Sequence, residues 1–283
     1  MDIKKIGIVG CGQMGSGIAE VCAKAGYEVT VVELDDPALA RGLGRVQKSM
    51  AKAVEKGKLA PADMEAALAR ITGTVRIEDL ADSDFVVEAV YEDLPTKQKV
   101  FADLDRTCPP EVILTTNTSS ISIAAIASAT KRGDKVLGVH FFNPVPVMKL
   151  VELVPSLMTG ESAIATARGF VESLGKTAVL AKDSPGFIVN RLLVAYLLDA
   201  IRVYEQGLAS RDDIDAAMQL GANHPMGPLA LSDFIGLDVI KSVADVFFQE
   251  YGEARFKSPP LLTRMVTAGQ LGRKTGKGFY DYK

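Results

Sequence analysis

Short apolar runs alternate with longer amphipathic stretches through the first half of the chain. Runs rich in Val and Ile cover residues 3–9 and 28–32, and a helical pattern lies between them. Buried strands show such continuous runs because helices cover both faces of a parallel sheet. Similar runs predict further strands over residues 85–90, 112–116, 136–142 and 148–154, with a helix over 95–104. This alternation predicts a Rossmann-like, doubly wound and mainly parallel sheet.

A glycine-rich loop follows the first predicted strand. Gly10 would form the tight turn, Gly12 would let a pyrophosphate approach the backbone, and Gly15 would allow close helix–strand packing. Such a loop can also be purely structural. Here it opens a helix and is followed by an acidic residue, Glu33, at the end of the next strand, which favours a dinucleotide site. Glu33 favours NAD over NADP because a carboxylate binds ribose hydroxyls and repels a 2′-phosphate, although Arg41 leaves NADP as the alternative.

One of the two histidines of the chain ends a predicted strand. A strand pair joined through residues 143–146 would bring Glu152 to His140, and a carboxylate partner orients an imidazole for proton transfer. A buried histidine with satisfied hydrogen bonds is the alternative. Ser119, Glu92 and His140 all lie at or just after strand ends, where ligands bind in this architecture. Their common position favours a catalytic His140.

A basic stripe runs along a predicted helix over residues 39–57. Apolar positions recur at helical spacing on one face, and cations recur on another beside Ser49. The cations of the stripe are Arg41, Arg45, Lys48, Lys52 and Lys56. Such a stripe is either a solvated face or a handle for an anionic part of the substrate, such as the phosphates of coenzyme A.

The second half of the chain shows helical patterns only. Residues 183–186 form a predicted hinge, which divides the chain into domains 1–183 and 184–283. The helix predicted over residues 187–206 is apolar nearly all round, which suits burial between domains or subunits and suggests a homodimer. It carries Asn190, a buried amide that needs a partner. Near the C-terminus, Lys274 belongs either to a simple turn or to the cofactor site.

Composition narrows the possible functions. The net charge of −3, the absence of Trp and the 6% aromatic content argue against nucleic acid and membrane partners. Cys11, Cys22 and Cys108 are too few and too scattered for a disulfide framework or a metal site. Because the chain starts directly with a predicted strand and shows no signal peptide, we expect a cytoplasmic protein.

Six segments together resemble the L-3-hydroxyacyl-CoA dehydrogenase family, especially its stand-alone bacterial members that act on 3-hydroxybutyryl-CoA. They are GCGQMGSGIAEV, NTSSISI, VHFFNPVPVMKLVE, DSPGFIVNR, PMGPLALSDFIGLD and GRKTGKGFYDY. The resemblance extends over essentially the whole chain. It implies reversible NAD(H)-dependent oxidoreduction of an (S)-3-hydroxyacyl-CoA by a homodimer with a helical C-terminal domain. The alternatives are a dehydrogenase of the same fold for a non-CoA hydroxy or sugar acid, and a non-catalytic NAD-binding protein.

The resemblance also implies roles for individual residues. His140 would be the acid–base residue, oriented by Glu152, while Ser119 and Asn190 would contact the substrate. The implied cofactor-binding residues are Gly10, Gly12, Gln13, Met14, Gly15, Glu33, Glu92, Lys97, Ser119, Asn143 and Lys274. The implied coenzyme A contacts are Ser49, Lys52 and Lys56, with Ser119 and Asn190 nearer the thioester.

Overall fold

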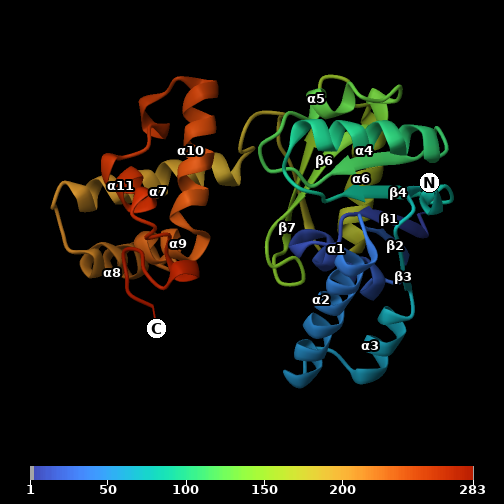
Figure 1. Cartoon of the computed structure of the whole chain (residues 1–283), viewed down its shortest axis with the longest axis horizontal. Coiled ribbons are helices and arrows are strands. Elements are labelled where there is room, and N and C mark those ends of the chain that lie inside the picture. Colours follow the sequence, from blue (N-terminus) through green and yellow to red (C-terminus); the bar gives the residue numbers. More distant parts are fainter. Residues whose placement is uncertain (1–2, 283) are drawn as a thin grey trace. The chain divides into compact units, whose positions relative to one another are not determined.

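The computed structural model describes residues 3–282 of the chain. The chain divides into two compact units between Ser184 and Pro185. The first unit contains all the strands of the described residues, and the second unit is helical (Figure 1). The Rossmann-like fold class followed by a helical domain is therefore confirmed.

An eight-stranded sheet forms the centre of the first unit, with the strand order β3-β2-β1-β4-β5-β6-β7-β8. Neighbouring strands are parallel except for β6 and β7, which pair antiparallel. The order reverses where β1 lies between β2 and β4, and ligands of such sheets bind beyond the strand ends at this point. The strands are β1 Lys5–Val9, β2 Glu28–Val32, β3 Ile71–Thr74, β4 Phe85–Glu88, β5 Ile113–Thr116, β6 Val136–Phe141, β7 Leu150–Pro155 and β8 Thr177–Leu180.

Side chains of the central strands are almost completely buried. Every residue of β4, β5 and β6 is buried, which explains why these strands appear as continuous apolar runs in the sequence. Ile6, Ile8 and Phe85 belong to one core cluster with Ile18 of the first helix and Met50 of the second. This packing fixes the carboxyl ends of β1, β4, β5 and β6, where the predicted site residues lie.

Helix starts in the first unit follow capping chemistry. The helix predicted over residues 39–57 begins earlier, at Asp36, because Asp35 caps it and Pro37 suits its first turn. It ends at Glu55, just before Gly57, which has a φ of 65°. The helices are α1 Gln13–Lys24, α2 Asp36–Glu55, α3 Pro61–Leu68, α4 Leu94–Thr107, α5 Ile123–Ala127 and α6 Glu161–Ser173, with 3₁₀ turns η1 Ile77–Leu80 and η2 Gly133–Lys135.

Helices of the second unit pack around their own apolar core. The helix predicted over residues 187–206 runs from Val189 to Glu205 and buries Leu197 and Ile201. Its predicted apolar surface is not buried all round within the unit, since Leu192 is 66% exposed. The helices are α7 Val189–Glu205, α8 Arg211–Ala222, α9 Pro228–Ile235, α10 Leu237–Tyr251 and α11 Pro260–Thr267, with 3₁₀ turns η3 Ala254–Phe256 and η4 Arg273–Thr275.

Two buried carboxylates hold the C-terminal segment on the second unit. Asp233 accepts hydrogen bonds from the backbone N–H groups of Phe279 and Tyr280, both at 2.9 Å. Asp215 accepts from the Tyr280 hydroxyl at 2.9 Å, and burial together with this bond raises the pKa of Tyr280. Within residues 3–282, none of the helices has the length and apolar character needed to cross a membrane.

Candidate active site

The predicted histidine–carboxylate pair lies across two antiparallel strands. His140 of β6 stands directly opposite Glu152 of β7 in the sheet register. The imidazole Nδ1 lies 2.8 Å from the Glu152 carboxylate Oε2. Glu152 is fully buried and His140 is 6% exposed, and the Phe142 ring packs on the imidazole with centroids 4.6 Å apart. A buried carboxylate at this distance fixes the ring orientation and favours an imidazolium that forms during proton transfer.

A cavity of about 340 Å³ opens beside His140. Its walls come from the start of α1, from the segments that follow β4 and β5, and from the end of β6 with the residues that follow it. The lining residues are Met14, Ala89, Val90, Glu92, Asn117, Ser119, His140, Phe141, Phe142 and Asn143. The structure thus brings the predicted residues Met14, Glu92, Ser119, His140 and Asn143 together around one cavity.

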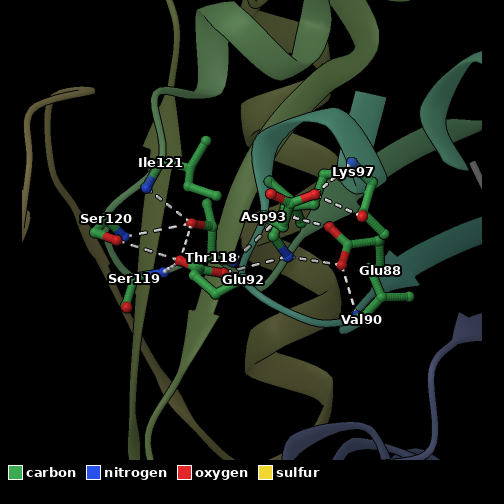
Figure 2. Close-up of polar contacts among 11 residues, drawn as sticks. Glu88, Val90, Glu92, Asp93, Lys97, Thr118, Ser119, Ser120 and Ile121 are labelled. Carbon is green, nitrogen blue, oxygen red and sulfur yellow. Dashed lines mark hydrogen bonds and ion pairs between the residues drawn. The ribbon is translucent and has the colours of Figure 1, made fainter. Parts of the chain in front are cut away.

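Ser119 lies on a loop that is tied to Glu92 (Figure 2). The backbone N–H of Ser119 donates to Glu92 Oε1 at 3.0 Å, and the Thr118 hydroxyl donates to the same oxygen. Thr118 Oγ1 in turn accepts the N–H of Ile121 at 2.9 Å. The carboxylate of Glu92 therefore fixes the backbone from which the Ser119 side chain projects.

Lys97 is enclosed by carboxylates (Figure 2). Its ammonium lies 2.7 Å from Glu88 Oε1 and 3.3 Å from Glu92 Oε2, and the side chain is 1% exposed. Glu88 is fully buried and also accepts from the N–H of Val90 at 2.6 Å and the Thr116 hydroxyl at 2.7 Å. Each of these buried charged groups is therefore paired with an oppositely charged group, and Glu88 also accepts hydrogen bonds. Burial of an ion requires partners of this kind.

The glycine loop fits a dinucleotide. Gly10 has a φ of 92°, and a Cβ on Gly15 would lie 1.8 Å from the Gly10 carbonyl oxygen, so neither position accepts a side chain. A Cβ on Gly12 would meet no atom within 4 Å, so this glycine leaves open space over the loop. No side chain caps α1 and its first turn holds no acidic residue, so its N-terminus can offer N–H groups to a pyrophosphate.

Glu33, which directly follows β2, forms a hydrogen bond with the glycine loop. Its Oε1 accepts the N–H of Cys11 at 2.6 Å, and its Oε2 accepts the N–H of Leu34 at 3.0 Å. Burial, together with the nearby Glu33 charge, raises the pKa of Cys11 to about 11, so this thiol stays protonated at neutral pH. The half-buried carboxylate is therefore held at the loop where ribose hydroxyls would need an acceptor.

Ser49, Lys52 and Lys56 are exposed and follow one another at helical spacing on α2 and its C-cap. Ser49 also lines a smaller cavity of about 160 Å³ with Gln13 and Asn143. Ser49 therefore shares one region of the first unit with two predicted cofactor-binding residues.

Two predicted site residues belong to the second unit. Asn190 is half-buried in the first turn of α7. Lys274 lies in η4, where its ammonium forms an ion pair with Asp238 at 2.6 Å to Oδ2. Both residues therefore belong to a different unit from the one that contains the cavity beside His140.

Asn117 and Phe142 line the cavity but were not predicted as site residues. The Asn117 side-chain oxygen accepts the N–H of Phe141 at 2.8 Å and so joins the end of β5 to β6. Its position directly after a predicted strand was a usable signal, because it is the same signal that pointed to Ser119. Phe142 follows His140 by two residues, and no polar pattern marks it.

Family models match nearly the whole chain. Residues 5–184 match the model described as "3-hydroxyacyl-CoA dehydrogenase, NAD binding domain". Residues 186–282 match "3-hydroxyacyl-CoA dehydrogenase, C-terminal domain". The boundary between the two matches coincides with the boundary between the two units of the structure.

Individual relatives are similar over all or nearly all of their lengths. A 3-hydroxybutyryl-CoA dehydrogenase of Mycobacterium tuberculosis is 51% identical over 282 residues, which is 99% of each chain. The mitochondrial hydroxyacyl-coenzyme A dehydrogenase of Homo sapiens is 43% identical over 99% of this chain and 92% of its own. The crystal structure of (S)-3-hydroxybutyryl-CoA dehydrogenase from Ralstonia eutropha superposes with a TM-score of 0.97 at 44% identity and covers 100% of both chains.

Proposed function

The chain belongs to the 3-hydroxyacyl-CoA dehydrogenase family, and we propose that it interconverts (S)-3-hydroxybutyryl-CoA and acetoacetyl-CoA with NAD(H). The observation that carries this proposal is the buried pair of His140 and Glu152 beside a cavity that Ser119 also lines. Relatives named for 3-hydroxybutyryl-CoA support the short acyl chain.

His140 is the proposed acid–base residue. Because Nδ1 faces Glu152, Nε2 is the ring atom that exchanges the proton with the substrate oxygen. In oxidation His140 takes the proton of the 3-hydroxyl group, and in reduction it returns a proton to the developing alkoxide. Glu152 stabilises the imidazolium between these events, and Ser119 donates a hydrogen bond that orients the substrate oxygen. General acid–base catalysis of this kind contributes about 10²–10⁴-fold.

NAD, when bound, supplies the hydride acceptor at its nicotinamide ring. The glycine loop and the α1 N-terminus would hold the pyrophosphate, and Glu33 the adenosine ribose. Glu33 supports NAD rather than NADP, because its carboxylate would repel a 2′-phosphate. The full proposed set is Gly10, Gly12, Gln13, Met14, Gly15, Glu33, Glu92, Lys97, Ser119, Asn143 and Lys274.

The coenzyme A part of the substrate would bind along α2. Lys52 and Lys56 carry exposed positive charges on the same side as Ser49, which suits phosphate groups. Asn190 of the second unit would contact the substrate near its thioester carbonyl. Most of the proposed cofactor and coenzyme A contacts thus belong to the first unit, whereas Asn190 and Lys274 belong to the second.

The second unit would also form a homodimer. Several of its large apolar side chains are exposed within a single chain, which is typical of a surface that binds another subunit. They are Ile188, Leu192, Leu208, Leu220, Phe234, Val239, Val246 and Phe248. The buried, unpaired thiols Cys11, Cys22 and Cys108 suit a reducing compartment and support the cytoplasm as the location.

The test is steady-state NADH oxidation with acetoacetyl-CoA, run in parallel with free acetoacetate and with NADPH. Turnover that needs both the thioester and NADH is the expected result. Reduction of free acetoacetate at the same efficiency would contradict the coenzyme A handle. Equal use of NADPH would contradict the argument from Glu33 and leave the reaction class intact.

A further inference from the structure

Glu20 of α1 is a buried carboxylate with an incomplete set of hydrogen-bond partners. The residue is 1% exposed, and its Oε1 lies 3.6 Å from the ammonium of the partly exposed Lys24. Its Oε2 is buried and accepts no hydrogen bond from any group of residues 3–282. Burying a carboxylate oxygen without a donor costs free energy, so such an oxygen in a folded protein needs an explanation.

The carboxylate lines the smaller cavity, of about 160 Å³, that Ser49 also lines. The walls of this cavity come from α1, from α2 and from residues 143–146, which follow β6. Sites that enclose a whole small molecule measure roughly 300–1,000 Å³. The cavity at Glu20 is therefore of a size that suits one segment of a longer ligand.

The position of this cavity indicates which segment it would hold. Ser49 is one of the proposed coenzyme A contacts, and Asn143 lines both this cavity and the cavity beside His140. The two cavities therefore adjoin at Asn143. When the phosphates of a thioester bind on α2 and its acyl group lies beside His140, the pantetheine arm is the part that remains between them.

The chemistry of the walls matches an amide group. The pantetheine arm carries two secondary amides, each with one N–H donor and one carbonyl acceptor, and apolar carbon groups separate them. An ionised Glu20 supplies only acceptors, and Arg45, which also lines the cavity, supplies only donors. Apolar side chains complete the walls, and they are Val46, Pro144, Val145 and Pro146. An amide N–H is thus the kind of donor that Glu20 Oε2 lacks.

We propose that Glu20 is a substrate-binding residue whose Oε2 accepts a hydrogen bond from an amide N–H of the pantetheine arm. The inference rests on the proposed use of a coenzyme A thioester and extends it from the phosphates to the arm. Because Glu20 does not line the cavity beside His140, its contact contributes to binding and not to the chemical step. It favours thioesters that carry this arm over free acids and simple thioesters.

Two substrates isolate this hydrogen bond. One is acetoacetyl-pantetheine, and the other is its analogue in which ester oxygens replace both amide nitrogens, so that the N–H donors are lost. With the wild-type protein, the KM of the analogue should be about tenfold to a hundredfold higher at a similar kcat. The reason is that the analogue loses a hydrogen bond to a charged group, which acts in binding alone.

Glu20→Met removes the acceptor at a similar side-chain length. In this variant the KM values of the two substrates should agree within about twofold, because neither forms the hydrogen bond. The NADH Kd should stay within about twofold of the wild-type value. Glu20→Gln keeps an acceptor without the charge and should give a KM ratio between those of wild type and Glu20→Met. Glu172→Met, which changes an exposed glutamate of the same unit, is the matched control.

The outcomes differ in what they contradict. A KM ratio near one with the wild-type protein would overturn the inference, and this measurement needs no variant to fold. The same high ratio in wild type and in Glu20→Met would also overturn it, because the amide would then bind elsewhere. A wild-type protein that turns over neither substrate would contradict the proposed function. The Kd of coenzyme A, which should rise about tenfold or more in Glu20→Met, would then decide the inference.

Discussion

At the residue scale, the pairing of His140 with Glu152 is the feature that most directly links sequence to chemistry. The pairing needs an antiparallel neighbour in an otherwise parallel region of the sheet, and β7 provides it. Because the two residues are register partners, backbone hydrogen bonds of the sheet set the side-chain distance rather than a flexible loop. Complete burial of Glu152 keeps its charge unscreened by water.

Replacing Glu152 by Gln should lower kcat by at least about a hundredfold, because the amide keeps the shape of the carboxylate but cannot stabilise an imidazolium. The NADH Kd, measured by fluorescence titration, should stay at the wild-type value. Glu161→Gln changes an exposed glutamate and serves as the control. Wild-type kcat in the Glu152 variant would remove this residue from the mechanism.

At the element scale, α2 and α4 show how helices present charge to the site. Both start at an aspartate cap, Asp35 and Asp93, followed by a proline in the first turn. This start fixes which side chains face inward: Met50 of α2 and Lys97 of α4 are buried, while Lys52 and Lys56 stay exposed. Helix placement therefore separates a buried cation from the exposed cations that are proposed to bind the substrate.

The proposed coenzyme A contacts on α2 predict a specific change in substrate affinity. Lys52→Ala and Lys56→Ala should each raise KM for acetoacetyl-CoA severalfold with little change in kcat, because they remove binding energy common to ground state and transition state. Neither should change KM for acetoacetyl-pantetheine, which lacks the nucleotide phosphates. Lys58→Ala, an exposed lysine outside the stripe, is the control. An equal rise in KM with both thioesters would place the phosphates elsewhere.

The Asp93 cap predicts a pH-dependent stability. The Thr96 side chain and backbone donate to its carboxylate, and these bonds lower the pKa of Asp93 below the ordinary value of 3.8. Its stabilising effect is therefore complete above about pH 4 and is lost as the pH falls through the lowered folded-state pKa. Asp93→Ala should lower the melting temperature near neutral pH by about 2–4 °C, and the difference from wild type should shrink in acid.

Asn at position 93 provides the control for this cap, because an amide oxygen accepts the same bonds at every pH. Asp93→Asn should stay close to wild type near neutrality and show no comparable loss in acid. A difference between Asp93→Ala and wild type that persists unchanged in acid would contradict a charged cap.

At the scale of the whole molecule, the architecture of both units could be predicted from the sequence. The strand–helix alternation and the helical second half follow from apolar spacing, which burial determines directly. The glycine loop follows from the spacing of its glycines directly after a strand. The elements β3, α3, α6 and β8 were not predicted. The two strands among them are short and contain no buried residue, so they lack the continuous apolar run that marked Val136–Phe141.

The candidate site was partly predictable for a related reason. The spacing of His140 and Glu152 on two apolar runs allowed a pairing that the structure contains. The contacts of Lys97 could not be inferred, because two carboxylates separated by a loop reach it only after α4 packs on the sheet. The roles of Asn190 and Lys274 stay predictions, because both residues belong to the second unit and the other predicted site residues belong to the first.

The exposed apolar side chains of the second unit predict the assembly state. Light scattering coupled to size exclusion should give twice the chain mass of 30.2 kDa at micromolar concentration. Burial of a surface such as Leu192, which is 66% exposed in the single chain, would supply the association energy. A mass of one chain across the same concentrations would contradict the homodimer.

Turnover of acetoacetyl-CoA with NADH, compared between the wild-type protein and His140→Gln, tests the proposed mechanism most directly. The wild-type protein should oxidise NADH only when the thioester is present. The variant should bind NADH with an unchanged Kd and turn over at least about a hundredfold more slowly. A variant that matches wild-type turnover would contradict His140 as the acid–base residue, and with it the proposed active site at the β6–β7 pair.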